Sequence, residues 1–89
     1  MLRGFVRGSR LSKSMIRSPQ HRALIAVLVG CRKQAGFTQM ELAKVMRRTQ
    51  SFVAQIEKGQ RQVYVAELFL FARAFKLDPQ ELFRRVATW

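Results

Sequence analysis

The chain has 89 residues, which suits one domain because independent domains typically hold about 50 to 150 residues. Its 17 Lys and Arg residues against 5 Asp and Glu residues give a formal net charge of +12. This charge favours a polyanionic partner, with nucleic acid ahead of an anionic membrane surface. Hydrophobic residues make up 48% of the chain, too many for a disordered basic tail, so we expect a folded domain with its charge outside.

Several classes of protein are disfavoured by what the sequence lacks. A single cysteine, Cys31, and a single histidine, His21, can form neither an intramolecular disulfide nor a four-ligand zinc site. The longest apolar run, Ala23 to Val29, is too short to span a membrane. The acids are scattered singly and no phosphate-binding glycine loop is present. We therefore expect no enzyme, no metal, no cofactor and no membrane partner, and a reducing cytoplasmic location in a bacterium.

The first residues differ in kind from the rest. Residues 1–22 contain six Lys and Arg side chains, no acid, and interspersed Gly and Ser. We expect residues 1–19 to form a flexible basic arm and residues 20–89 to form the folded domain. A disordered end, an arm that tracks a DNA groove, a transit peptide of mitochondrial type and a translation start at Met15 all fit this composition.

The rest of the chain predicts five helices and an all-α fold. The first helix runs for about 15 residues from Gln20 and closes at Gly36, because glycine readily takes a left-handed conformation. Thr38 and Glu41 form a Thr-x-x-Glu capping box at the start of the second helix. The third helix covers residues 50–58 and ends at Gly59.

Two more helices follow before the end of the sequence. One is expected from about Val65 to Phe75. The other opens at Asp78-Pro79, with an acid at the N-cap and proline at the first helical position. No stretch alternates with period two for long enough to form a paired strand.

The third helix has two contrasting faces on a helical wheel. Phe52, Val53 and Ile56 share one arc, which predicts the core side. The opposite arc carries amides, a hydroxyl, a methyl and a lysine, with no acid. A glutamine amide offers a donor and an acceptor in one plane, which matches the edge of adenine in the major groove. Only Arg47-Arg48-Thr49 separates this helix from the preceding one, as in a helix-turn-helix.

Residues 24–83 strongly resemble the Cro and phage-repressor type of helix-turn-helix domain, the XRE family. The motifs that carry the resemblance are Thr38-Gln39-x-x-Leu42-Ala43, Ile56-Glu57-x-Gly59, Leu68, Ala72-Arg73-Ala74 and Leu77-Asp78-Pro79. The resemblance implies a five-helix lambda-repressor-like fold whose second and third helices form the helix-turn-helix. It also implies that Gln50, Ser51 and Gln55 read bases and that Gln39 binds a phosphate.

Further roles follow from the same resemblance and from charge. An ion pair between Arg32 and Glu57 would fix the recognition helix to the scaffold. The expected contacts with the DNA backbone come from Gln39, Arg47, Arg48, Thr49, Lys58 and Arg61. Two positions depart from the family, because Arg47 and Lys76 stand where glycine is frequent. Arg47 must then either adopt a left-handed conformation or change the turn, and Lys76 predicts a looser helix end.

Apolar residues beyond the needs of one core predict a partner surface. Val65, Leu68, Phe71, Ala72 and Phe75 suit the interior of the fourth helix. The expected homodimer interface comprises Phe69, Leu70, Phe83 and Trp89. In the alternative, these side chains complete the core of a compact monomer.

The function expected from these observations is sequence-specific binding of double-stranded DNA by a small transcriptional regulator, as a repressor. The alternative is a protein-interaction module with the same fold, either an antitoxin that binds a small toxin or an adaptor.

Overall fold

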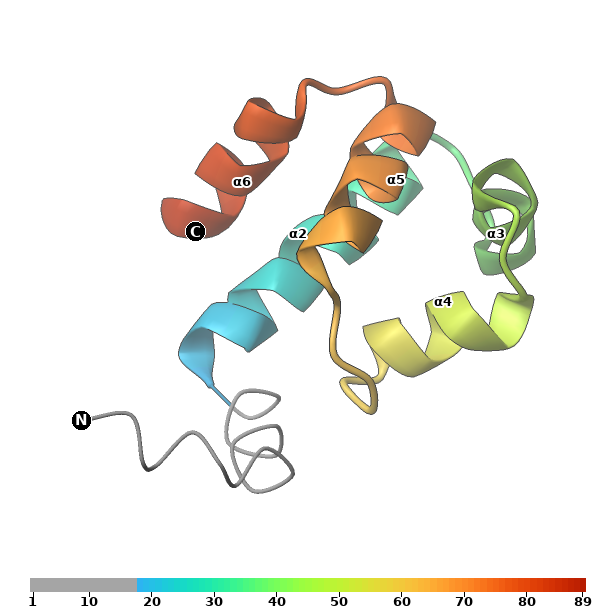
Figure 1. The fold of residues 1–89 in the computed structure, drawn as a ribbon, viewed down its shortest axis with the longest axis horizontal. Coiled ribbons are helices and arrows are strands. Elements are labelled where there is room, and N and C mark those ends of the chain that lie inside the picture. Colours follow the sequence, from blue (N-terminus) through green and yellow to red (C-terminus); the bar gives the residue numbers. More distant parts are fainter. Residues whose placement is uncertain (1–17) are drawn as a thin grey trace.

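The computed structural model describes residues 18–89, and these residues form helices without any strand (Figure 1). The helices, in chain order, are α2 (Pro19–Gln34), α3 (Gln39–Met46), α4 (Gln50–Glu57), α5 (Val65–Phe75) and α6 (Pro79–Ala87). Helix α2 packs against α4, α5 and α6, and α3 packs against α4 and α5. The all-α prediction with five helices is confirmed for this part of the chain.

The helical domain begins earlier than the sequence analysis placed it. Ser18 is the N-cap of α2, its side-chain oxygen accepts a hydrogen bond from the backbone N–H of His21, and Pro19 occupies the first helical turn. Helix α2 therefore begins at Pro19, one residue before the start expected at Gln20. The predicted arm otherwise falls on residues 1–17, which lie outside the described residues.

The predicted caps form at the starts of α3 and α6. Thr38 and Glu41 make the reciprocal capping box, with distances of 3.1 and 2.9 Å. These contacts with Thr38, chiefly the one with its backbone N–H, lower the pKa of the Glu41 carboxyl. The Asp78 carboxylate accepts a hydrogen bond of 2.8 Å from the backbone N–H of Gln80. Local sequence therefore fixes both helix starts.

Two helices end on a residue with a side chain in the left-handed conformation. Arg47 after α3 has φ 58° and Lys76 after α5 has φ 57°, each at a cost of about 1 kcal/mol. The expectation that the Lys76 end is loose is wrong. The backbone N–H of Leu77 donates to the carbonyl of Ala72 at 2.9 Å, the same closure that Arg48 makes after α3.

The core lies where α2, α3, α4, α5 and α6 meet. The buried hydrophobic residues there are Val27, Leu28, Cys31, Leu42, Ala43, Met46, Val53, Ile56, Phe71, Ala72, Ala74 and Leu82. Cys31 is buried as a small hydrophobic residue, as the sequence predicted.

Two predictions about the core side of a helix need correction. Val65, expected inside, is the first residue of α5 and is 72% exposed. Leu70, expected outside, is partly buried and packs against the core cluster. The angle at which α5 crosses its neighbours decides both positions, and a helical wheel does not contain that angle.

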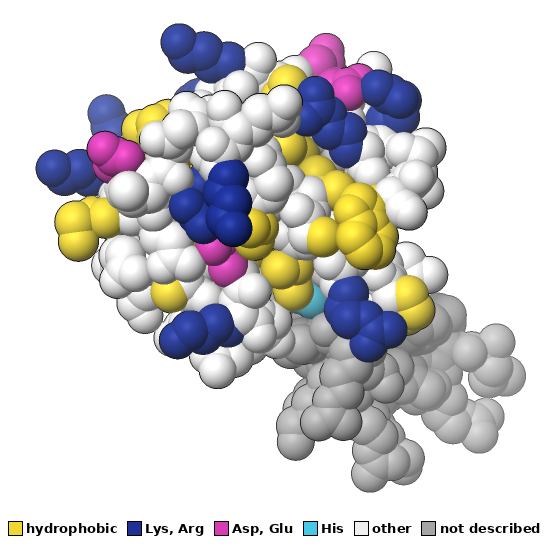
Figure 2. Space-filling view, turned by 180° about the vertical axis from the view of Figure 1, so that it is seen from behind, with side chains coloured by type: hydrophobic (Ala, Val, Ile, Leu, Met, Phe, Trp, Pro, Cys, Tyr) yellow, Lys and Arg dark blue, Asp and Glu magenta, His cyan; other side chains and the backbone are white. Residues whose placement is uncertain are grey.

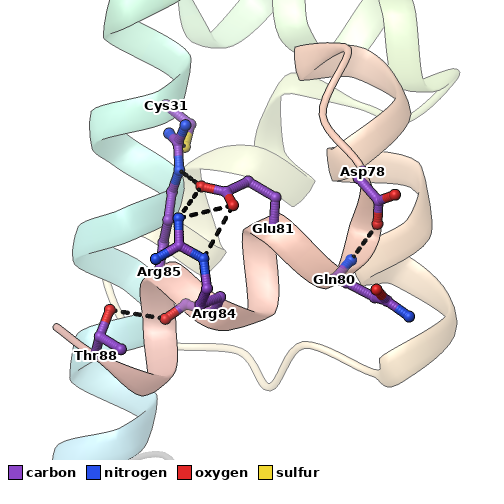
Figure 3. Close-up of polar contacts among 7 residues, drawn as sticks. All are labelled: Cys31, Asp78, Gln80, Glu81, Arg84, Arg85 and Thr88. Atoms are coloured by element: carbon purple, nitrogen blue, oxygen red, sulfur yellow. Dashed lines mark hydrogen bonds and ion pairs between the residues drawn. The ribbon is translucent and has the colours of Figure 1, made fainter.

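Helix α6 carries a local cluster of charges around Glu81 (Figure 3). Glu81 pairs with Arg84 at 2.8 Å and with Arg85 at 2.9 Å, and the hydrogen bonds from Arg84 make the largest contribution to lowering the pKa of its carboxyl. Arg85 also reaches the Cys31 sulfur of α2, with Nη1 at 3.6 Å from Sγ. Arg85 thereby contacts both its own helix and α2.

None of the helices in the described part of the chain has the length and apolarity that a membrane crossing demands.

Candidate nucleic-acid interface

Helix α4 presents a polar face to solvent and an apolar face to the core. Gln50, Ser51 and Gln55 are exposed, whereas Val53 and Ile56 are fully buried. We call the three exposed residues the recognition face. The helix starts at Thr49, whose side chain accepts a hydrogen bond of 3.1 Å from the backbone N–H of Phe52. The faces expected from the wheel are therefore those of the structure.

Glu57, at the end of α4, binds the scaffold through Arg32 of α2. The two side chains form a bidentate pair, with Arg32 Nε at 2.6 Å from Oε2 and Nη2 at 3.1 Å from Oε1. A third nitrogen, Nη1, donates to the backbone carbonyl of Phe37 at 2.8 Å. The Arg32 and Glu57 side chains are only 12% and 10% exposed. The pair implied by the family resemblance is thus present. It connects α2 with α4 and with the loop that precedes α3.

Two glutamine amides extend this pair to the recognition face. Gln39, at the start of α3, donates from Nε2 to Glu57 Oε1 at 2.8 Å. Gln50 donates from Nε2 to Gln39 Oε1 at 2.9 Å. Each amide nitrogen carries two N–H groups, so Gln50 retains one donor and its carbonyl acceptor. These are the two groups that a bidentate contact with adenine requires.

Three of the cations predicted to contact the DNA backbone lie just before or just after α4 in the sequence. Arg47 and Arg48, in the turn between α3 and α4, and Lys58, after α4, are exposed. Within residues 18–89 none of the three forms a salt bridge. Thr49 is exposed as well as capping α4. All four can reach a phosphate without breaking an ion pair.

Arg61 is placed differently from the other predicted backbone contacts. Its guanidinium forms a bidentate pair with Glu67 of α5, at 2.9 and 2.8 Å, and lies 4.6 Å from the ring centroid of Phe52. The sequence analysis missed this cluster. Its only sequence signal was a glutamate three residues after Tyr64, the spacing of an N-terminal cap.

All five acids of the chain have structural partners. Glu57 and Glu67 pair with arginines between elements, and Glu81 pairs with two arginines on its own helix. Glu41 and Asp78 cap helices. None of these carboxylates belongs to the recognition face, whose exposed residues are Gln50, Ser51 and Gln55.

The four residues expected at a homodimer interface do not form one patch. Leu70 lines a hollow beside Arg47 and Arg73, whereas Trp89 lies near Ala26 and Gly30 of α2. Phe83 lines an apolar groove between α2, α5 and α6. The other apolar side chains of this groove are Leu24, Val63, Val65, Leu68, Leu82 and Val86.

Phe69 lies one helical turn after Val65 and is 56% exposed. Figure 2 shows the hydrophobic side chains gathered beside the histidine. The exposed large apolar side chains within α5 and α6 are Val65, Phe69 and Phe83, of which Val65 and Phe83 line the same groove.

His21 takes part in the packing of α2, with 8% of its surface exposed. Burial lowers the pKa of its imidazole, and a hydrogen bond to the backbone of Arg61 acts in the opposite direction. The described residues contain no group of three or more side chains that could hold a metal ion.

The geometry agrees with comparisons to known proteins. The helix-turn-helix family matches residues 31–82, more than half of the chain. The structure is similar to the XRE-family like protein from Pseudomonas syringae pv. tomato str. DC3000, with 34% sequence identity and a TM-score of 0.75. That match covers 85% of this chain and 93% of the other. The chain belongs to the XRE family of helix-turn-helix proteins. It is a member of a family of DNA-binding regulators and not of a family of enzymes.

Other solved structures share the XRE fold. The restriction-modification controller protein C.AhdI from Aeromonas hydrophila has 28% identity and a TM-score of 0.62, covering 73% of this chain and 99% of that one. The clp gene regulator ClgR from Corynebacterium glutamicum has 24% identity and a TM-score of 0.71, with 80% and 76% covered. A search of curated protein sequences gave no match.

Proposed function

We propose that this XRE-family protein represses transcription by binding a specific sequence in double-stranded DNA. The observation that carries the proposal is the chain of contacts from Arg32 through Glu57 and Gln39 to Gln50. It holds a base-reading amide in a fixed place on an exposed helix face without acids. A fixed amide loses less conformational entropy when it binds a base.

Within this proposal the recognition face enters the major groove. Gln50 contacts adenine with its remaining donor and acceptor, and Ser51 and Gln55 contact neighbouring bases. Gln39, Thr49, Arg47, Arg48 and Lys58 contact the phosphates on either side. Repression follows when the bound protein covers a promoter. The lone buried Cys31 suits a bacterial cytoplasm, with the protein on the nucleoid when bound.

We further propose that two copies bind together through the apolar surface of α5 and α6. Val65, Phe69 and Phe83 expose more than half of their surfaces, at 72%, 56% and 65%. Burying such side chains contributes about 1.5 to 3 kcal/mol each before the entropy of association is subtracted. A two-fold dimer would place its half-sites about 10 base pairs apart, centre to centre. The preferred DNA would then be an inverted repeat.

The base-reading role is tested by Gln55→Ala, with Gln80→Ala on α6 as the matched control. Gln55→Ala should weaken binding to a duplex selected from random DNA by about 1 to 3 kcal/mol and leave binding to random DNA nearly unchanged. Equilibrium titration by fluorescence anisotropy measures both. The control should bind both duplexes like the unmodified protein. Equal losses on the two duplexes with Gln55→Ala would remove base reading from this face.

The dimer is tested by Phe83→Glu, with Leu70→Glu for contrast. Phe83→Glu should give a folded monomer that binds half-sites weakly, because the charge enters only the interface. Leu70→Glu should lower the free energy of unfolding instead, because Leu70 packs against the core. Sedimentation equilibrium and urea unfolding separate the two results. A monomeric unmodified protein at tens of micromolar would refute the dimer.

The antitoxin or adaptor alternative is favoured by the same apolar groove. A hydrophobic segment of a small toxin could occupy the surface that a second copy would otherwise cover. Stoichiometric co-purification of such a partner, together with no enrichment of any sequence from random DNA, would support this alternative over the repressor.

A further inference from the structure

We propose that Arg61 is a positioning residue, which holds the recognition helix against the start of α5, and not a phosphate contact. This inference rests on the proposed DNA binding. It changes the role of a cation that the sequence alone places among the backbone contacts.

The guanidinium of Arg61 is already engaged within the protein. Nη1 donates to Glu67 Oε1 at 2.9 Å and to the backbone carbonyl of Gln62 at 2.8 Å, and Nη2 donates to Glu67 Oε2 at 2.8 Å. The Arg61 side chain is 30% exposed and that of Glu67 is 12% exposed. Binding a phosphate through the same fork would break a bidentate, partly buried pair.

The Arg61–Glu67 pair replaces a cap that α5 lacks. The N-cap residue of α5 is Tyr64, and its side chain makes no capping hydrogen bond. Glu67, in the first turn, accepts from the backbone N–H of Tyr64 at 2.9 Å. Hydrogen bonds from Arg61 make the largest contribution to lowering the pKa of the Glu67 carboxyl, so the charged form that caps the helix is favoured. Arg61 thereby fixes the start of α5.

The same guanidinium contacts the recognition helix. It lies 4.6 Å from the ring centroid of Phe52, and the Phe52 ring stacks at 6.3 Å on Phe71 of the core. The backbone of Arg61 also lies beside the buried ring of His21 on α2, where it acts to raise the pKa of the imidazole. The loop after α4 also donates a hydrogen bond from the Gln60 N–H to the Gln55 carbonyl and packs Val63 on the core, and Arg61 adds the charged contacts with α4 and α5. Without the Arg61 guanidinium, α4 would lose its charged contact with the loop and with the start of α5.

Arg61→Lys is the discriminating variant, because lysine keeps the charge but loses the planar fork. A positioning role predicts that this variant loses about tenfold of its preference for a selected duplex over random DNA, with an unchanged dependence on salt. Arg84→Lys is the matched control. Arg84 is an exposed arginine of α6 that also binds a glutamate, Glu81, at 2.8 Å, and it lies outside the proposed DNA interface. Its variant should keep both the preference and the salt dependence.

Glu67→Gln supplies an independent variant that keeps an oxygen for the cap but removes the charge. It should reproduce the loss seen with Arg61→Lys, and the double variant should lose no more than either single one. The same cycle in urea unfolding needs no DNA. In that experiment each single change should lower the equilibrium constant for folding about fivefold, and the double variant should lower it no further than either single one.

The outcomes separate this inference from the proposed function. A wild-type preference with Arg61→Lys, together with a salt slope about one unit smaller for Arg61→Gln, would show a phosphate contact and overturn the positioning role. Additive losses in the unfolding cycle would overturn it as well. An unmodified protein without preferential DNA binding would overturn the proposed function, and the positioning of α4 by Arg61 would then be decided by the unfolding cycle alone.

Discussion

Two glutamates, Glu57 and Glu67, each hold an arginine by two hydrogen bonds, yet they stabilise different parts of the molecule. The Arg32–Glu57 pair is about 10% exposed on both sides and continues through Gln39 to the exposed amide of Gln50. The Arg61–Glu67 pair is more open on the arginine side, at 30%, and ends in a loop. The same chemistry therefore orients a binding group in one place and fixes a backbone segment in the other. The protein's function depends on what each pair holds.

The largest expected difference between the two pairs is in stability. Glu57→Ala should lower the free energy of unfolding by about 3 kcal/mol, because it leaves the mostly buried Arg32 without a partner. Glu67→Ala should cost about 1 kcal/mol, since Arg61 can turn toward water. Urea unfolding followed by circular dichroism measures both. A greater loss for Glu67→Ala would reverse the comparison.

A smaller effect is expected on binding when the link between Glu57 and the recognition face is cut. Gln39→Ala removes the acceptor of Gln50 and the donor to Glu57, so the Gln50 amide becomes free to rotate. We expect affinity for a selected duplex to fall by about 1 to 2 kcal/mol, with little change in unfolding. Gln34→Ala, at the end of α2, is the control and should change neither. Undiminished affinity with Gln39→Ala would show that the link does not orient Gln50.

The smallest expected effect is a pH dependence of the stability of the folded state, caused by His21. Burial lowers the pKa of His21 below its ordinary value, so the folded state binds a proton less readily than the unfolded chain. The neutral ring therefore contributes fully to stability above the pKa that His21 has in the unfolded chain. This contribution is lost as the pH falls from that pKa to the lower pKa of the folded state. Thermal midpoints between pH 7 and pH 5 should decline more for the unmodified protein than for His21→Gln. Parallel declines would exclude His21 as the cause.

The parts of the structure that follow from short-range sequence were predictable. Thr38 with Glu41, and Asp78 with Pro79, act within three residues, and they set the helix starts that the structure contains. Ser18-Pro19 is the same kind of start. The basic, acid-free composition of residues 1–22 favours an arm at that position instead.

The parts that depend on how helices cross were not predictable. Val65 and Leu70 exchange their expected positions because the orientation of α5 on its neighbours decides which side is covered. The Arg61–Glu67 pair joins an irregular loop to a helix. The periodicity of a sequence predicts the faces of helices and strands but not the position of a side chain in a loop. The Arg32–Glu57 pair spans 25 positions and was expected only through the family resemblance.

The central claim is that the recognition face of α4 reads a DNA sequence, and selection of bound duplexes from a random pool tests it most directly. The unmodified protein should enrich one motif containing adenine, in two inverted half-sites about 10 base pairs apart. The same selection with Gln50→Ala and Gln55→Ala should lose the preference at particular positions of the half-site while the others remain. A pool that stays random after repeated rounds, or an enriched motif that neither variant changes, would contradict the claim.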